Sequence, residues 1–149
     1  MRTGLAKGVA ALVLCWLMGC SDPITDVVEF DDLHPAFGRV TFQGRPMSGG
    51  SVRLHPVDGK ATGDVYTGVV AEDGSFDLNT FRRAGRGVGV PAGDYEVAFS
   101  WTGGPDDNAE LSSDELPERL PAKLTRPKSS GVRVSVEQGE NILPDFDLE

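Results

Sequence analysis

The chain has 149 residues, of which 14 are Lys or Arg and 23 are Asp or Glu, giving a net charge of −9. An acidic chain without clustered Lys and Arg cannot neutralise a phosphate backbone, so we expect no nucleic-acid partner. The length suits one domain, and the two cysteines, Cys15 and Cys20, both stand near the N-terminus.

Residues 1–19 have the pattern of an export signal. A basic start precedes an unbroken apolar run of ten residues, 9–18. A membrane-spanning helix needs about 20 apolar residues, whereas a shorter run is typical of the hydrophobic part of a cleavable signal. Residues 17–20, Leu-Met-Gly-Cys, resemble the lipobox of bacterial lipoproteins.

This resemblance implies cleavage between Gly19 and Cys20 and transfer of a diacylglyceryl group to the sulfur of Cys20. The alternative is an ordinary secretory signal cut near a cysteine. Each buried methylene of an acyl chain contributes about 0.8 kcal/mol, and two or more chains give stable attachment. We therefore expect a membrane partner, held through the lipid on Cys20. Removal of Cys15 with the leader would leave one thiol and no intramolecular disulfide.

Cleavage after residue 19 would leave 130 of the 149 residues. Because the leader contains two basic residues and no acid, 12 basic and 23 acidic residues remain, a net charge of −11. Such a body repels an anionic membrane surface, so the lipid would hold it there. Ser21 resembles the outer-membrane address used in some diderm bacteria. We expect a lipid-anchored protein of the cell envelope, with the outer membrane favoured over the inner.

Residues 20–35 are predicted to be the lipidated cysteine followed by an acidic tether. Residues 21–35 contain five acids and no Lys or Arg, and prolines bracket the segment. Their few apolar residues cannot make a core element. We expect a mostly disordered tether that is extended by self-repulsion.

Residues 36–149 are predicted to form one all-β domain. From residue 37 onward, apolar and polar residues alternate in short runs separated by Gly, Pro, Asn and Asp. This period of two, with turn residues between the runs, indicates an antiparallel β-sandwich of seven strands. Pro144 favours an edge position for the last strand. The expected strands lie in residues 39–43, 51–55, 65–71, 76–79, 95–101, 132–136 and 142–148.

Four stretches carry a family resemblance. VTFQGRPMSGGSVRL, EDGSFDL and VPAGDYEVAFS resemble the hairpins and strand entry of carboxypeptidase regulatory-like and transthyretin-like domains. LPAKLTRPKSSGVRVSVEQGENILPDFDL is similar to the close of small bacterial lipoproteins that carry this domain. The resemblance implies a seven-stranded, prealbumin-like sandwich, usually without enzymatic activity. Within it, the Tyr95 hydroxyl is expected to bond a nearby carbonyl.

Catalytic chemistry is not expected. One enzyme branch of the transthyretin-like group, the hydroxyisourate hydrolases, has paired histidines, an arginine and a C-terminal Tyr-Arg-Gly-Ser, whereas this chain ends in Asp-Phe-Asp-Leu-Glu. The histidines here, His34 in the tether and His55 on the polar face of a strand, form no visible pair. G-x-S-x-G motifs and zinc-spaced Cys or His clusters are missing from the sequence. We therefore predict no enzyme and no cofactor.

Residues 102–130 form one long interruption, in which we expect a loop. Ser112 to Glu115 fits a capping box and predicts a short helix. Leu120, Pro121 and Leu124 are expected to fold back onto the sandwich. Loops of this length are often functional.

Two groups of acids raise the question of calcium, which needs six to eight converging oxygens. We favour turn formation and a solvated acidic loop, because neither group has an EF-hand spacing. Calcium binding by residues 105–118 stays an alternative. The groups are Asp64, Asp73 and Asp77, and then Asp106, Asp107, Glu110, Asp114, Glu115 and Glu118.

Trp101 is the one candidate ligand contact. It continues the inward series of its strand, which favours core filling, but it also stands at a strand end beside the long loop. We expect a non-catalytic β-sandwich that serves as a structural or protein-interaction module, its envelope partner unknown. The alternative is a carbohydrate-binding module for envelope glycans that uses Trp101 and residues 102–130.

Overall fold

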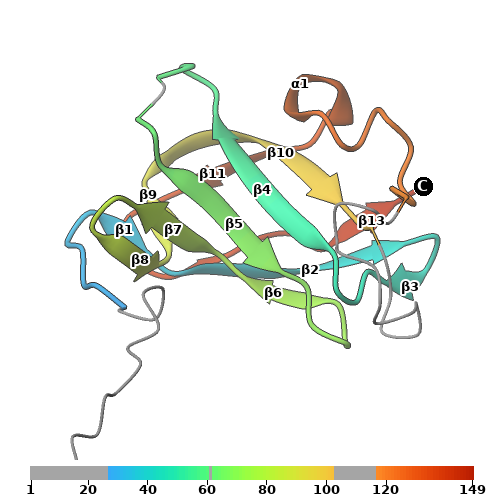
Figure 1. The fold of residues 1–149 in the computed structure, drawn as a ribbon, viewed down its shortest axis with the longest axis horizontal. Helices are drawn as coiled ribbons and strands as arrows, with labels where there is room; N and C mark the ends of the chain where they lie inside the picture. Colours follow the sequence, from blue (N-terminus) through green and yellow to red (C-terminus); the bar gives the residue numbers. More distant parts are fainter. Residues whose placement is uncertain (1–26, 61, 103–116) are drawn as a thin grey trace, which may run out of the picture.

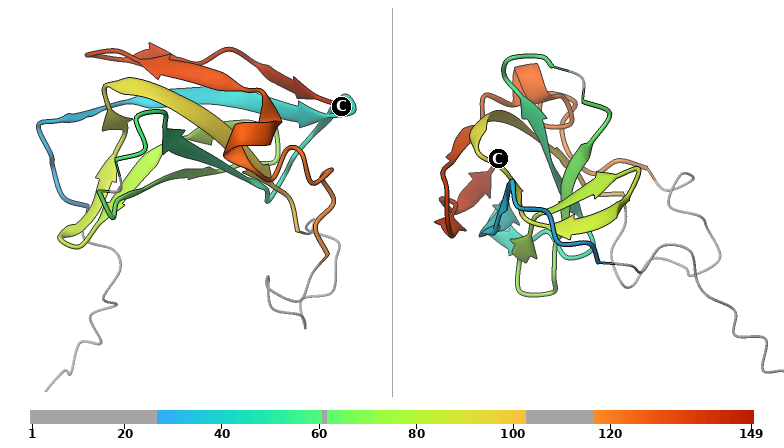
Figure 2. Two further views of the ribbon diagram at one scale, coloured as in Figure 1. Left: turned by 90° about the horizontal axis from the view of Figure 1, so that it is seen from above. Right: turned by 90° about the vertical axis from the view of Figure 1, so that its left-hand side faces the viewer.

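The computed structural model describes residues 27–60, 62–102 and 117–149, which form an all-β sandwich as predicted (Figure 1). One layer is a six-stranded antiparallel sheet in the order β11-β10-β4-β5-β7-β8. Figure 2 shows this layer facing the second one. The strands of the first layer are β4 (Ser51–Pro56), β5 (Val65–Val69), β7 (Asn79–Arg82), β8 (Gly85–Val88), β10 (Gly93–Ser100) and β11 (Arg133–Val136).

The second layer is built around β2 (Ala36–Phe42), which pairs with four short strands. Two of these are antiparallel to it, whereas β12 and β13 pair with it in parallel. This differs from the antiparallel pairing expected throughout, because the chain crosses from β11 into the other layer before it reaches β2. Pro144, which lacks an N–H, lies in the gap between β12 and β13. The short strands are β3 (Arg45–Pro46), β6 (Ser75–Asp77), β12 (Asn141–Ile142) and β13 (Phe146–Leu148).

The core lies between the two layers and follows the predicted alternation. On β10, Tyr95, Val97 and Phe99 are all buried. Phe146 of the other layer meets the Phe99 ring edge-on at a centroid distance of 5.5 Å and stacks on Phe76 at 6.1 Å. The Tyr95 hydroxyl donates to the carbonyl of Pro91 at 2.7 Å, as predicted from the sequence.

The hairpin of β7 and β8 has no counterpart among the predicted strands. Its inward positions are taken by Thr80 and Gly87, so the apolar alternation that marks a strand is missing. The buried Thr80 hydroxyl is satisfied by the carbonyl of Gly89 at 2.7 Å. A buried polar group with a partner replaces the apolar side chain that a sequence pattern would register.

The prediction of a mostly disordered tether is wrong for residues 27–35. The N–H of Val28 donates to the carbonyl of Arg86 at 2.8 Å, and β1 (Leu33–His34) pairs with β9 (Val90–Pro91). A Cβ on Gly87 would stand 2.3 Å from Leu33 Cδ1, so the missing side chain lets the segment pack closely. Residues 20–26 of the predicted tether lie outside the described residues.

The predicted helix at Ser112–Glu115 lies outside the described residues. A short helix that was not predicted, α1 (Pro127–Ser130), lies against β10 (Figure 1). Leu120 and Leu124 are buried as predicted, but Pro121 is exposed, because its carbonyl closes a turn to the Leu124 N–H while its ring faces solvent. Within the described ranges, no helix is long and apolar enough to cross a membrane.

Candidate functional site

Two of the predicted site residues cannot be placed. Gly19 and Cys20 lie outside the described residues, as does the acidic loop up to residue 116. Glu118, the one described member of that acidic group, accepts hydrogen bonds from the Ser100 hydroxyl at 2.7 Å and the Trp101 backbone N–H at 2.8 Å. It therefore fastens the end of the loop to the end of β10.

The carboxylates of the other acidic group, Asp64, Asp73 and Asp77, do not converge on one point. Asp64 binds Arg82, and Asp73 accepts bonds from the hydroxyl and N–H of Ser75. Those bonds from Ser75, the largest effect, lower the pKa of Asp73. In the part of the chain that is described, no group of three His, Cys, Asp or Glu side chains could hold a metal ion.

Trp101 is half-buried against the core. Its indole N–H donates to the carbonyl of Ser48 at 3.0 Å, and the edge-on Phe42 ring lies 6.3 Å away between centroids. The guanidinium carbon of Arg119 stands 5.2 Å from the centre of the indole. The ring is therefore partly engaged by the protein itself, and less of it is free to stack on a sugar than the sequence suggested.

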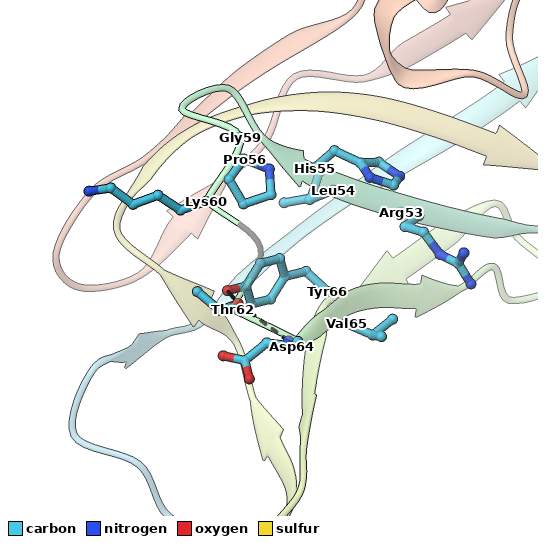
Figure 3. A pocket seen from close by; sticks show the side chains of 11 residues that line it. Arg53, Leu54, His55, Pro56, Gly59, Lys60, Thr62, Asp64, Val65 and Tyr66 are labelled. Carbon is cyan, nitrogen blue, oxygen red and sulfur yellow. Dashed lines mark hydrogen bonds between the residues drawn. The ribbon is translucent and has the colours of Figure 1, made fainter.

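The candidate site is a hollow of about 460 Å³ where β4 and β5 diverge before the loop that joins them (Figure 3). Arg53 and His55 of β4 line it, with Thr62 and Tyr66 on the other side. Because side chains alternate along a strand, Leu54 points into the core while its two neighbours share the outer face. The side chain of Arg53 makes no hydrogen bond or ion pair with another described residue.

A second hollow of about 300 Å³ lies along the same face of β4. Arg53 and His55 line this one too, and its other wall is formed by Thr125 and Pro127 of the segment that packs on β10. The two side chains thus stand in one groove between the loop after β4 and this wall. In the sequence His55 stands out only as a histidine without a partner, and Arg53 was not predicted as a site residue, although the two form an i, i+2 pair of basic residues on one strand.

His55 is directly opposite Glu96 of β10. Burial lowers the pKa of His55 below its ordinary value of 6.5, and the charge of Arg53 lowers it further, while Glu96 acts in the other direction. His34 is not brought to this site: it lies in β1, where its Nδ1 accepts the N–H of Gly139 at 3.2 Å.

The titration of His55 tests this description of the groove. We expect NMR titration of the imidazole to give a pKa below 6.5. Arg53→Gln should raise that pKa because it removes a neighbouring positive charge, whereas Arg45→Gln, an exposed change in the other layer, should leave it unaltered. A pKa above 6.5 in the wild-type protein would mean that Glu96 outweighs burial.

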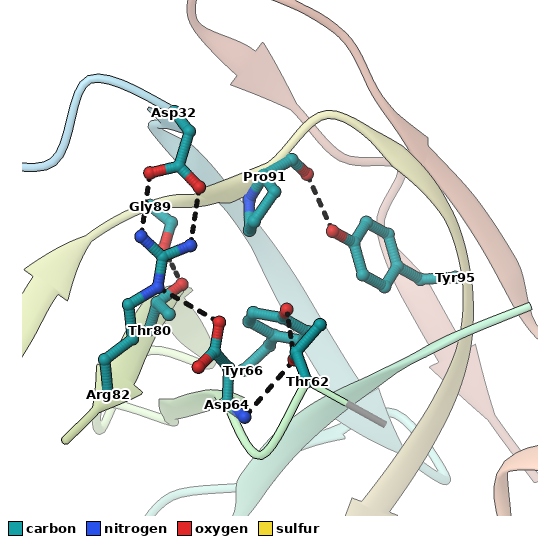
Figure 4. A network of polar contacts seen from close by, with 9 residues as sticks. All are labelled: Asp32, Thr62, Asp64, Tyr66, Thr80, Arg82, Gly89, Pro91 and Tyr95. Atoms are coloured by element: carbon teal, nitrogen blue, oxygen red, sulfur yellow. Dashed lines mark hydrogen bonds and ion pairs between the residues drawn. The ribbon is translucent and has the colours of Figure 1, made fainter. Parts of the chain in front are cut away.

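A network of polar contacts lies beside the groove (Figure 4). The guanidinium of Arg82 donates two bonds to Asp32, at 2.7 and 2.5 Å, and a third to Asp64 at 3.0 Å. Phe30 covers the guanidinium carbon at 4.8 Å from its ring centre. The bonds to Asp32 raise the pKa of Arg82 most, and the Arg82 bonds in turn lower the pKa of Asp32. Asp64 therefore pairs with Arg82 and forms no ion pair with Arg53.

These features define a small two-layer β-sandwich with an open basic groove on its six-stranded sheet. No protein-family model matches the chain, and no curated protein matches it either. Among solved structures, a "DUF3823 family protein" from Parabacteroides merdae is similar at 18% identity and a TM-score of 0.37. The match covers 76% of this chain and 44% of that one, so the chain spans less than half the length of the matched structure.

Proposed function

We propose that this protein is an exported lipoprotein, anchored in the cell envelope through Cys20, whose β-sandwich is a non-catalytic module for structure or protein interaction. The leader and its Gly19–Cys20 junction support the anchor, and the resemblance to carboxypeptidase regulatory-like domains supports the role of the sandwich. The observation that carries the proposal is the attachment of residues 27–34, which begin seven positions after Cys20, to the edge of the six-stranded sheet.

This attachment suits a tethered domain. The seven Cα–Cα steps from Cys20 to Val27 span at most about 25 Å, so a lipid on Cys20 would keep the β8 edge near the membrane. Force on the anchor would reach the fold through the bonds of Asp32 to Arg82 and the pairing of β1 with β9. If the segment after the anchor were not paired with the sheet, the sandwich would have no fixed orientation relative to the membrane.

The groove supports binding over catalysis. The guanidinium of Arg53, which has no ion-pair partner within residues 27–60, 62–102 and 117–149, offers N–H donors, and the Tyr66 hydroxyl at the end of the groove lies 3.3 Å from the Thr62 hydroxyl. General acid–base or nucleophilic catalysis needs a nucleophile and a base within hydrogen-bond reach. Among the described residues of the first hollow, the Thr62 and Tyr66 hydroxyls pair with each other and not with a histidine or carboxylate. In the second hollow the Ser100 hydroxyl donates to Glu118, and within the described ranges that pair is bonded to no histidine.

The anchor is tested by metabolic labelling with a fatty acid in a diderm bacterial host. Wild-type protein should take up the label and be cut after Gly19. Cys20→Ala should abolish the label and that cleavage, because the acylated sulfur is lost. Cys15→Ala is the matched control and should remain labelled, since Cys15 lies within the leader. Wild-type protein without label, or Cys20→Ala with it, would contradict the proposal.

A further inference from the structure

The groove on β4 differs in charge from the protein as a whole. The chain carries a net charge of −9, yet the outward positions of β4, β5, β7 and β8 present Arg53, His55 and Arg86 and no carboxylate. Of the acids next to the groove, Asp64 is bound to Arg82 at 3.0 Å and Glu96 to Arg133 at 3.0 Å. These two carboxylates therefore already have a cation, and Glu118, beside the second hollow, accepts bonds from the Ser100 hydroxyl and the Trp101 N–H.

Among the described residues, the Arg53 guanidinium therefore stands in a hollow without an ion-pair partner. A guanidinium presents a planar set of N–H donors that matches carboxylate and phosphate oxygens in a two-point contact. The His55 imidazole, two residues along the same face, offers an N–H donor in both its neutral and its charged form. Lys60 of the loop lines the same hollow, but its ammonium is paired with Asp58 at 3.7 Å.

Apolar side chains continue the surface beyond the cations. Val65 of β5 lines the same hollow as Arg53 and His55, and it is paired in register with Phe81 of β7. Val65 and Phe81 are 40% and 38% exposed. A ligand with an anionic group at Arg53 would therefore find apolar surface for the rest of its body.

We propose that the Arg53–His55 groove binds an oxyanion, a carboxylate or phosphate group carried by a larger envelope ligand. The inference deepens the proposed function, since it gives the chemistry of the partner that the module takes. The competing explanation is that Arg53 is simply solvated. In that case the groove would bind anions no more tightly than other exposed cations of this acidic protein do.

The test uses the purified full chain in detergent and isothermal titration calorimetry at about physiological ionic strength, where weak surface attraction is screened. The probes are polygalacturonate, a carboxylate polymer, polyphosphate, and the neutral polymer dextran. We expect one of the two anionic polymers to bind and dextran not to bind. Which of the two binds tells a carboxylate ligand from a phosphate ligand.

Arg53→Gln should weaken that binding at least tenfold, because it removes the two-point contact, and His55→Gln should weaken it less. Arg45→Gln makes the same charge change at an exposed position of β3 in the other layer and should stay within twofold of wild type. Equal losses for Arg45→Gln and Arg53→Gln, an unchanged Arg53→Gln, or no binding of either anion would overturn the proposal. The result does not depend on acylation of Cys20, so it fails or succeeds separately from the anchor.

Discussion

Phe76→Ala should lower the free energy of unfolding by about 3–5 kcal/mol, within the range for buried aromatic side chains. The Phe76 ring is buried between the two layers, where it stacks on Phe146 at a centroid distance of 6.1 Å. A Cβ built on Gly38 of β2 would stand 3.0 Å from the tip of this ring, so a residue without a side chain forms that wall of its site. Because Gly38 has no side chain that could move into the space left by the Phe76 ring, the cavity should remain largely open. We therefore expect a loss of free energy of unfolding near the upper end of this range.

Urea unfolding followed by tryptophan fluorescence measures the effect, with His55→Ala as the control. His55 lies on the open face, so its truncation should change the free energy of unfolding by less than about 0.5 kcal/mol. Comparable losses for the two variants would mean that the inward and outward faces of the strands have been assigned wrongly.

The sequence predicts the central strands well because their apolar residues alternate without a break. Val97 and Phe99 on β10 and Val52 and Leu54 on β4 occupy every second position, and all four are buried. This alternation can be recognised without knowing which strands pair, because one face of each strand must be apolar to form a core.

The N-terminal segment could not be predicted in the same way. Its acids suggest self-repulsion, but Asp32 is neutralised by Arg82, 50 residues further along the chain. No local pattern records a contact over that separation. The groove was missed for a related reason, because its depth comes from the divergence of β4 and β5 and from the packing of Thr125 and Pro127 on the same face. Arg53 looks like any exposed strand residue until those walls are in place.

Arg82→Ala should lower the free energy of unfolding by about 1.5–3 kcal/mol, the range for hydrogen bonds that involve charged groups. The side chain of Arg82 is only 20% exposed, and its removal leaves Asp64, 17% exposed, without the cation that offsets its burial. The other partner, Asp32, is 56% exposed and can return to water, which limits the loss. The same change also removes the guanidinium that Phe30 covers, so residues 27–34 should detach more easily than the rest of the fold.

Limited proteolysis with chymotrypsin, read by mass spectrometry, separates this local release from global unfolding. Arg82→Ala should be cut near Phe30 and Leu33 at least tenfold faster than wild type under conditions where the sandwich stays intact. Arg83→Ala removes the same charge at the exposed neighbouring position and should be cut like wild type. Arg82 lowers the pKa of Asp32 below 3.8, so the ionised carboxylate holds the segment at any pH above the lowered pKa. With pepsin, which is active in acid, the wild-type segment should lose its protection only as the pH falls through that lowered pKa. Equal cutting of Arg82→Ala and Arg83→Ala would show that the pairing of β1 with β9 holds the segment without the ion pairs, and that force from an anchor would reach the fold through that pairing alone.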